Sequence, residues 1–176
     1  MSWLHFHLLI NHFPVIGAWF LVIFLIIALR WKNPDFNRII YGLFIALAFA
    51  AYASLLSGQH AEHQLHSSGL PFQSMHDNIE LHEAAAAWTW LAFLLAGILA
   101  LIGLLKVQAS RWLIPVLLIL SLGMTALSSW TALLGGMIIH TEIRDEPVSR
   151  FAEQIHLPKL RLGGKHRQQA KQSGDD

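Results

Sequence analysis

The chain has 176 residues, of which 55% are hydrophobic and only 13% are charged, and its formal net charge at pH 7 is +1. This composition is not that of a soluble globular domain. The sequence contains no cysteine, which excludes structural disulfides, thiolate-bound iron–sulfur clusters and the covalent attachment of a c-type haem.

Four long apolar runs dominate the chain. They cover about residues 13–31, 39–57, 84–105 and 113–139, and the charged residues lie at or beyond their ends. A helix of about 20 apolar residues crosses the ~30 Å hydrocarbon core of a bilayer. The sequence therefore predicts an all-α fold, a four-helix transmembrane bundle formed by residues 1–144. Residues 145–176 are predicted to be a polar extramembrane tail that is partly disordered.

The distribution of Lys and Arg predicts the orientation, because short connections rich in these residues stay in the cytoplasm. The connection over residues 58–83 has neither residue type, whereas the two flanking connections carry Arg30, Lys32, Arg38, Lys106 and Arg111. We therefore expect a multi-pass protein of the bacterial inner membrane. Its N- and C-termini are predicted to lie on the outer, periplasmic side.

Most histidines of the chain flank the apolar runs at this outer end, and these are His5, His7, His12, His60, His63, His66, His82 and His140. Ionisable groups at a membrane boundary are costly unless they find partners. Converging histidines therefore indicate a functional site.

The strongest candidate ligands come one from each predicted helix. For a cofactor they are His12, His60, His82 and His140, and for a metal ion they are His12, His82 and His140. Other residues beside them are candidates to hydrogen-bond the ligands or to serve as alternative metal ligands, namely Glu62, His63, Glu83 and Glu142. The remaining histidines are interpreted as solvated or interfacial groups, namely His5, His7, His66, His76, His156 and His166.

Small residues near the candidate ligands favour a flat macrocycle. Gly136 lies four residues before His140, and Gly58 lies two residues before His60. A haem between helices needs such gaps, and its imidazole ligands need an acceptor on the other ring nitrogen. The same histidines and carboxylates also suit zinc, copper or non-haem iron. Spacing alone does not separate these two chemistries.

Four motifs carry a resemblance to known proteins. They are Asn-His-Phe-Pro-Val-Ile-Gly at 11–17, Ser-Gly-x-x-Ala-Glu at 57–62, His-Glu-Ala-Ala at 82–85 and Leu-Gly-Gly-Met-Ile-Ile-His-Thr-Glu-Ile-Arg at 134–144. Together they resemble a family of small bacterial four-helix membrane proteins that has no assigned function. They are also distantly similar to a domain-of-unknown-function group whose first helix opens with His-Phe-Pro.

The resemblance implies a four-span fold with a shared polar site, built on His12, Glu62, His82, Glu83, His140 and Glu142. This chain departs from the family pattern at two places. Histidines replace the acidic residues expected at 60–66, and Ile139 stands where the family tends to carry arginine.

The functional prediction is an integral membrane electron-transfer protein with a b-type haem held by histidines at the outer end. It would act as a subunit or relay of a respiratory or redox complex, rather than as a stand-alone enzyme. Two alternatives remain open: a non-haem zinc, copper or iron protein, and a cofactor-free assembly or proton-conducting subunit. The expected partners are the lipid bilayer and other membrane or periplasmic redox subunits, without nucleic acid.

Overall fold

The structure is a computed structural model that describes residues 2–67, 76–106, 110–143, 147–155 and 158. These residues are almost entirely helical and contain no strand. In chain order the elements are α1 (Trp3–Ile10), α2 (His12–Trp31), α3 (Pro34–Ser67), α4 (His76–Leu105), α5 (Ser110–Ile139), the 3-10 turn η3 (Thr141–Ile143) and α6 (Pro147–Gln154). The all-α prediction is confirmed.

Four helical segments are long and apolar enough to cross a membrane: Trp3–Trp31, Pro34–Gln64, His76–Leu105 and Trp112–Ile139. They correspond to the four predicted spans. The helices run further than the apolar runs, because a helix keeps its backbone hydrogen bonds after its side chains become polar. As a result, His60 and His63 lie on α3, and His76 opens α4.

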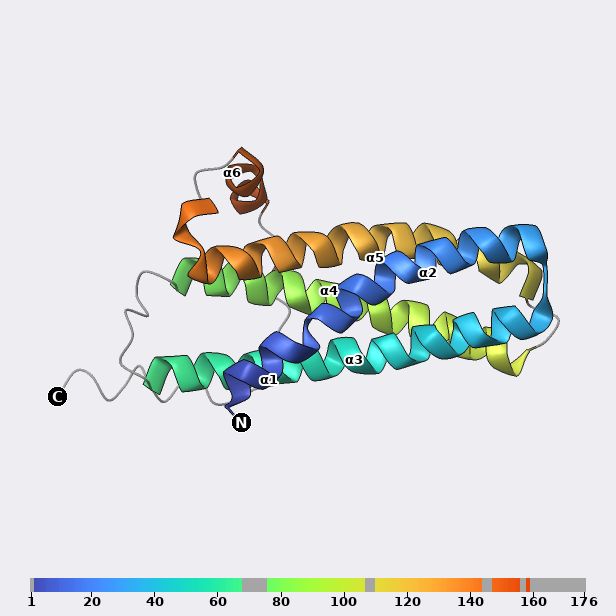
Figure 1. Ribbon diagram of the computed structural model, residues 1–176, viewed down its shortest axis with the longest axis horizontal. Coiled ribbons are helices and arrows are strands. Elements are labelled where there is room, and N and C mark those ends of the chain that lie inside the picture. The colour runs from blue at the N-terminus through green and yellow to red at the C-terminus, as the bar shows by residue number, and fades with distance from the viewer. Residues whose placement is uncertain (1, 68–75, 107–109, 144–146, 156–157, 159–176) are drawn as a thin grey trace.

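The first span is broken into two helices at Asn11. Proline has no backbone N–H, and its ring clashes with the carbonyl group four residues earlier. Pro14 therefore prevents a regular helix from running through Ile10, and the chain restarts as α2 at His12. Helix α1 packs against α3, whereas α2 packs mainly along α5 and also contacts α3. Figure 1 shows α1 and α2 crossing the face of the bundle diagonally.

The turn between α2 and α3 is defined by local hydrogen bonds. Lys32 ends α2 in the left-handed conformation, with φ of 52°, and its backbone N–H donates to the Ala28 carbonyl oxygen. The Asn33 side chain then accepts from the backbone N–H groups of Asp35 and Phe36 at 2.9 and 3.2 Å. Asparagine before the first turn is a preferred helix cap. This turn therefore starts α3 immediately after α2 ends.

The bundle core lies where α3 packs along α4, α4 along α5 and α5 along α2. Large buried side chains from all four helices fill it, including Leu25, Phe44, Phe93 and Leu117, each 0% exposed. At Gly97 a Cβ atom would lie 3.0 Å from the Cβ of Ala48. Glycine therefore permits the close approach of α4 to α3, as small residues do in membrane bundles.

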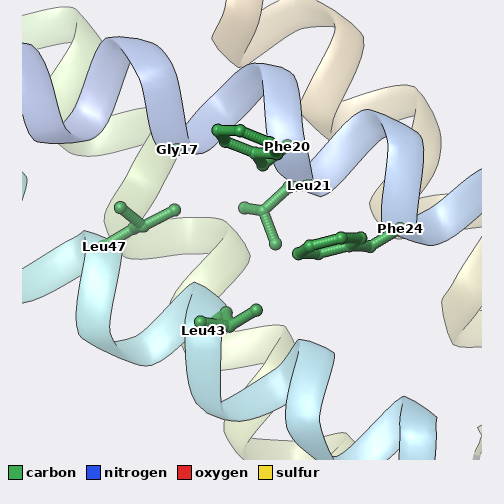
Figure 2. Close-up of a pocket in the computed structure, with 6 residues that line it drawn as sticks. All are labelled: Gly17, Phe20, Leu21, Phe24, Leu43 and Leu47. Atoms are coloured by element: carbon green, nitrogen blue, oxygen red, sulfur yellow. The ribbon is translucent and has the colours of Figure 1, made fainter.

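A shallow apolar groove of about 350 Å³ lies between α2 and α3 (Figure 2). Its lining residues are Gly17, Phe20, Leu21, Phe24, Leu43 and Leu47. None of these side chains can ligate a metal or transfer a proton. The groove is therefore a packing feature between two spans, and the chemistry has to come from elsewhere.

The segment after α5 contains structure that the sequence analysis did not predict. It forms η3 and the short helix α6, which packs against α5. The end of the predicted polar tail, residues 159–176, lies outside the described residues.

Candidate cofactor site

One end of the bundle is formed by α1, the last turns of α3, the first turns of α4 and the end of α5 (Figure 1). We call it the histidine end. The basic residues of the two short connections that fall in the described part of the chain, Arg30, Lys32, Arg38 and Lys106, lie at the opposite end. The clustering of histidines at one end thus follows from the antiparallel order of the helices.

His82, on α4, is partly buried between helices. Its Nδ1 lies 2.9 Å from the backbone carbonyl oxygen of Thr131 on α5. Since a carbonyl oxygen only accepts, Nδ1 carries the proton and donates. In the neutral ring the other nitrogen, Nε2, is then the one with a free lone pair.

His7, on α1, is held in the same manner by α3. Its Nδ1 lies 3.0 Å from the Ser54 carbonyl oxygen and 3.0 Å from Ser57 Oγ. The Ser57 hydroxyl donates to the Ser54 carbonyl oxygen at 2.9 Å, so Oγ acts as an acceptor toward His7. His7 therefore also carries its proton on Nδ1, and its Nε2 is available as a ligand.

The two imidazole rings lie close together at the histidine end, in an edge-to-face arrangement. Their ring centres are 6.4 Å apart and their planes meet at 79°. Each ring rests on a glycine of a neighbouring helix: a Cβ atom at position 58 would lie 3.1 Å from His7 Cε1, and one at position 135 would lie 2.9 Å from His82 Cε1. The glycines therefore form two cradles that fit the imidazole rings.

Two buried polar atoms near this pair have no hydrogen-bond partner in the described part of the chain. They are Trp130 Nε1, on α5, and Asn11 Oδ1, at the junction of α1 and α2. Trp130 packs against the buried cluster of Ala85, Leu134 and Met137. It directly precedes Thr131, whose backbone carbonyl oxygen binds His82. Unpartnered buried polar groups are uncommon and need a physical reason. A bound polar group at this end would supply one.

The structure leaves His12 and His60 on the outside of the bundle. His12 Nδ1 donates to the Leu8 carbonyl oxygen at 2.9 Å, and His60 Nδ1 donates to the Leu56 carbonyl oxygen at 2.8 Å. Both side chains are exposed. The His60 ring stacks on Trp3, with ring centres 4.6 Å apart. Neither histidine joins the pair of His7 and His82.

His140 and Glu142 form a separate exposed contact at the end of α5. His140 Nδ1 lies 2.9 Å from Glu142 Oε1, and the two side chains are 61% and 69% exposed. The backbone N–H of Glu142 itself and, second, the His140 side chain hold the pKa of Glu142 below its ordinary value. The contact thus favours the carboxylate form of Glu142. It is separate from the pair of His7 and His82.

The remaining predicted site residues lie around the rim. Glu62 and Glu83 are partly buried, and His63 is exposed. Within the residues that the structure describes, no group of three or more His, Asp or Glu side chains is placed to hold a metal ion. His12, His82 and His140 are therefore not brought together here. His156 and His166 lie outside the described residues.

The sequence interpretation of His7 is a solvated or interfacial group, whereas the structure holds its ring by hydrogen bonds to α3. The signal that identifies it is the set of small residues Ser54, Ser57 and Gly58, three and four apart on one face of α3. In the sequence these residues stand beside His60. In the structure they receive the ring of a different helix.

Comparison with known proteins identifies no relative, since no family model, no curated protein and no solved structure matches the chain.

Proposed function

We propose that this protein is an integral membrane electron-transfer protein that binds a b-type haem through His7 and His82. The observation that supports the proposal is the close pair of imidazole rings, whose centres are 6.4 Å apart. Metal–imidazole bonds are about 2.0–2.1 Å long, so two imidazoles on opposite sides of one metal ion have ring centres roughly 6 Å apart. The observed separation fits that requirement.

The number of donors favours haem over the other metals of the sequence analysis. A zinc site in a protein has at least three protein ligands, and no group of three is present among the described residues. A haem needs only one or two axial side chains, because the macrocycle supplies the other donors. Two imidazoles with no third ligand among the described residues therefore match haem better than zinc, copper or non-haem iron.

The protein groups around the pair would orient it. The Ser54 and Thr131 carbonyl oxygens accept the Nδ1–H of each ring, which leaves Nε2 as the nitrogen that would bind the iron. Such outer hydrogen bonds select the tautomer and raise the basicity of the ligating nitrogen. Gly58 and Gly135 allow the rings to sit close to the helix backbones. When bound, haem iron supplies one-electron oxidation and reduction.

The position of the pair bears on the role in the cell. It lies at the histidine end, away from Arg30, Lys32 and Arg38, which the positive-inside rule assigns to the cytoplasm. We therefore propose that the haem lies near the outer face of a bacterial inner membrane. Electrons would pass to or from membrane or periplasmic redox subunits, and the protein would act as a relay or subunit.

The first experiment is an oxidised-minus-reduced visible spectrum of the full chain in mild detergent, with metal analysis of the same sample. We expect a b-type spectrum with bound iron. A colourless protein with stoichiometric zinc or copper would contradict the haem proposal and support the alternative of a non-haem metal protein. A sample with neither would leave a cofactor-free subunit and overturn the proposal.

Three single variants then test the ligands. We expect His7→Ala and His82→Ala each to lose the low-spin spectrum of a haem with two imidazole ligands. His140→Ala should keep it, because His140 lies apart from the pair and is exposed. The opposite pattern, loss in His140→Ala and retention in His7→Ala, would favour the ligand set predicted from the sequence.

A further inference from the structure

The chain turns back along the bundle after α5 instead of leaving it. Ile143, in η3, packs against the buried cluster of Ala85, Leu134 and Met137. Its Cδ1 atom would lie 3.7 Å from a Cβ at Gly136, which is one turn before the end of α5. The chain at η3 therefore lies beside the spanning helices.

Two contacts further along the chain keep this segment beside the bundle. Helix α6 packs against α5. After α6, the Pro158 carbonyl oxygen accepts a hydrogen bond of 2.9 Å from Trp88 Nε1 on α4. Trp88 is six residues beyond His82, so it lies about 9 Å further along α4 toward the middle of the span. The chain around α6 is thus at the level of the outer part of the span.

Helix α6 also has the properties of a helix that lies in a membrane surface. It is far more amphipathic than the spanning helices. Figure 1 shows it nearly end-on beside α5, so its axis crosses the spans instead of following them. Such helices lie in the interface with their apolar face about 5–10 Å into the boundary between headgroups and acyl chains.

The described side chains of α6 divide into two faces. Ser149 is 1% exposed, whereas Phe151 is 64% exposed. Two residues correspond to about 200° around a helix, so Phe151 points away from the face that Ser149 buries. Beside a membrane bundle that direction is lipid, and aromatic rings are enriched at this level. Exposed aromatic side chains of α1, Trp3 and Phe6, lie at the same end.

We infer that α6 binds the lipid surface at the histidine end, with the Phe151 ring among the upper acyl chains and the Arg150 guanidinium at the lipid phosphates. Arg150 is exposed and lies about 100° around the helix from Phe151. Arginine at this position places its charge in the headgroup layer while its stem covers apolar surface. The inference requires the bundle to span a membrane, but it does not depend on a haem.

The absence of native cysteines makes the test direct, because one introduced cysteine is the only labelling site. The full chain in lipid nanodiscs would carry a spin label at Phe151→Cys or Arg150→Cys. Reference positions are Ile119→Cys, 71% exposed in the first third of α5 and within its apolar span, and Asp77→Cys, exposed in the first turn of α4. Collision rates with oxygen report lipid, and those with a water-soluble nickel complex report water.

We expect the label at 151 to collide with oxygen more often than with nickel. Its ratio of oxygen to nickel collision rates should lie between the ratios at positions 119 and 77. The label at 150 should collide with nickel at least twofold more than the label at 151. If the label at 151 collides with the nickel complex as often as the label at 77, α6 lies in water and the inference is overturned. Low access to both reagents would show that another protein surface covers Phe151, which would also overturn it. Since Phe151 is exposed, its replacement leaves the core intact.

Discussion

At the scale of single residues, the two glycines beside the histidine pair determine how the imidazoles are held. Gly135 is the tighter cradle, since a Cβ there would lie 2.9 Å from Cε1 and 3.1 Å from Nδ1 of His82. The ring cannot withdraw freely, because the same Nδ1 is bound to the Thr131 carbonyl oxygen. A methyl group at 135 therefore has to displace the imidazole.

We predict that Gly135→Ala weakens haem retention and lowers the melting temperature of the protein in detergent. Overpacking of a filled site costs ~1–3 kcal/mol, which corresponds to roughly 5- to 150-fold in affinity. The measurement is haem occupancy by the absorbance ratio of haem to protein, with a thermal melt of the same sample.

Gly123→Ala is the matched control on the same helix. A Cβ at position 123 meets nothing within 4 Å, and alanine has the better intrinsic helix propensity. We expect this variant to be neutral or slightly stabilised. Equal behaviour of the two variants would contradict the cradle at Gly135.

At the scale of elements, α1 is attached to the bundle in an unusual way. None of its residues is buried, and the Asn11 break separates it from α2. It packs against α3, and its polar and aromatic contacts there include the hydrogen bonds of His7 with Ser54 and Ser57 and the stack of Trp3 on His60. The position of His7 relative to His82 therefore depends on how α1 packs on α3.

We predict that Trp3→Ala loosens α1 and leaves the rest of the bundle unchanged. An aromatic stack contributes about 0.5–1.5 kcal/mol, so amide hydrogen exchange over residues 3–10 should rise roughly two- to tenfold. The control is Trp19→Ala, since Trp19 is 56% exposed and lies about two turns into α2. Unchanged exchange in Trp3→Ala would show that the stack does not hold α1.

At the scale of the whole molecule, charge is distributed unevenly between the two ends. In the described residues the short connections at one end carry Arg30, Lys32, Arg38 and Lys106, and the histidine end holds Asp77 and several glutamates. This asymmetry predicts that the histidine end faces outward.

We predict that a cysteine at Asp77 reacts with a membrane-impermeant maleimide in right-side-out vesicles, and that a cysteine at Lys106 reacts only in inside-out vesicles. The two residues lie at opposite ends of α4. The reverse labelling would invert the orientation. Labelling of both from one side would show that α4 does not cross the membrane.

The sequence predicted the architecture because the relevant physics is local. Each run of about 20 apolar residues is long enough to become a span by itself, and antiparallel helices joined by short turns bring alternate ends together. The four long helices and the collection of histidines at one end followed from these two facts. The same reasoning placed His82 among the candidate ligands.

Which histidines meet was decided by the tertiary structure alone. The rotation of a helix about its axis is set by the neighbour it packs against, and α1 packs against α3. The face of α3 formed by the small residues Ser54, Ser57 and Gly58 contacts the ring of His7 from α1. The ring of His60, which belongs to the same helix, hydrogen-bonds the Leu56 carbonyl oxygen instead. A pairing between α1 and α4 depends on packing far apart in the chain, and no local pattern encodes it.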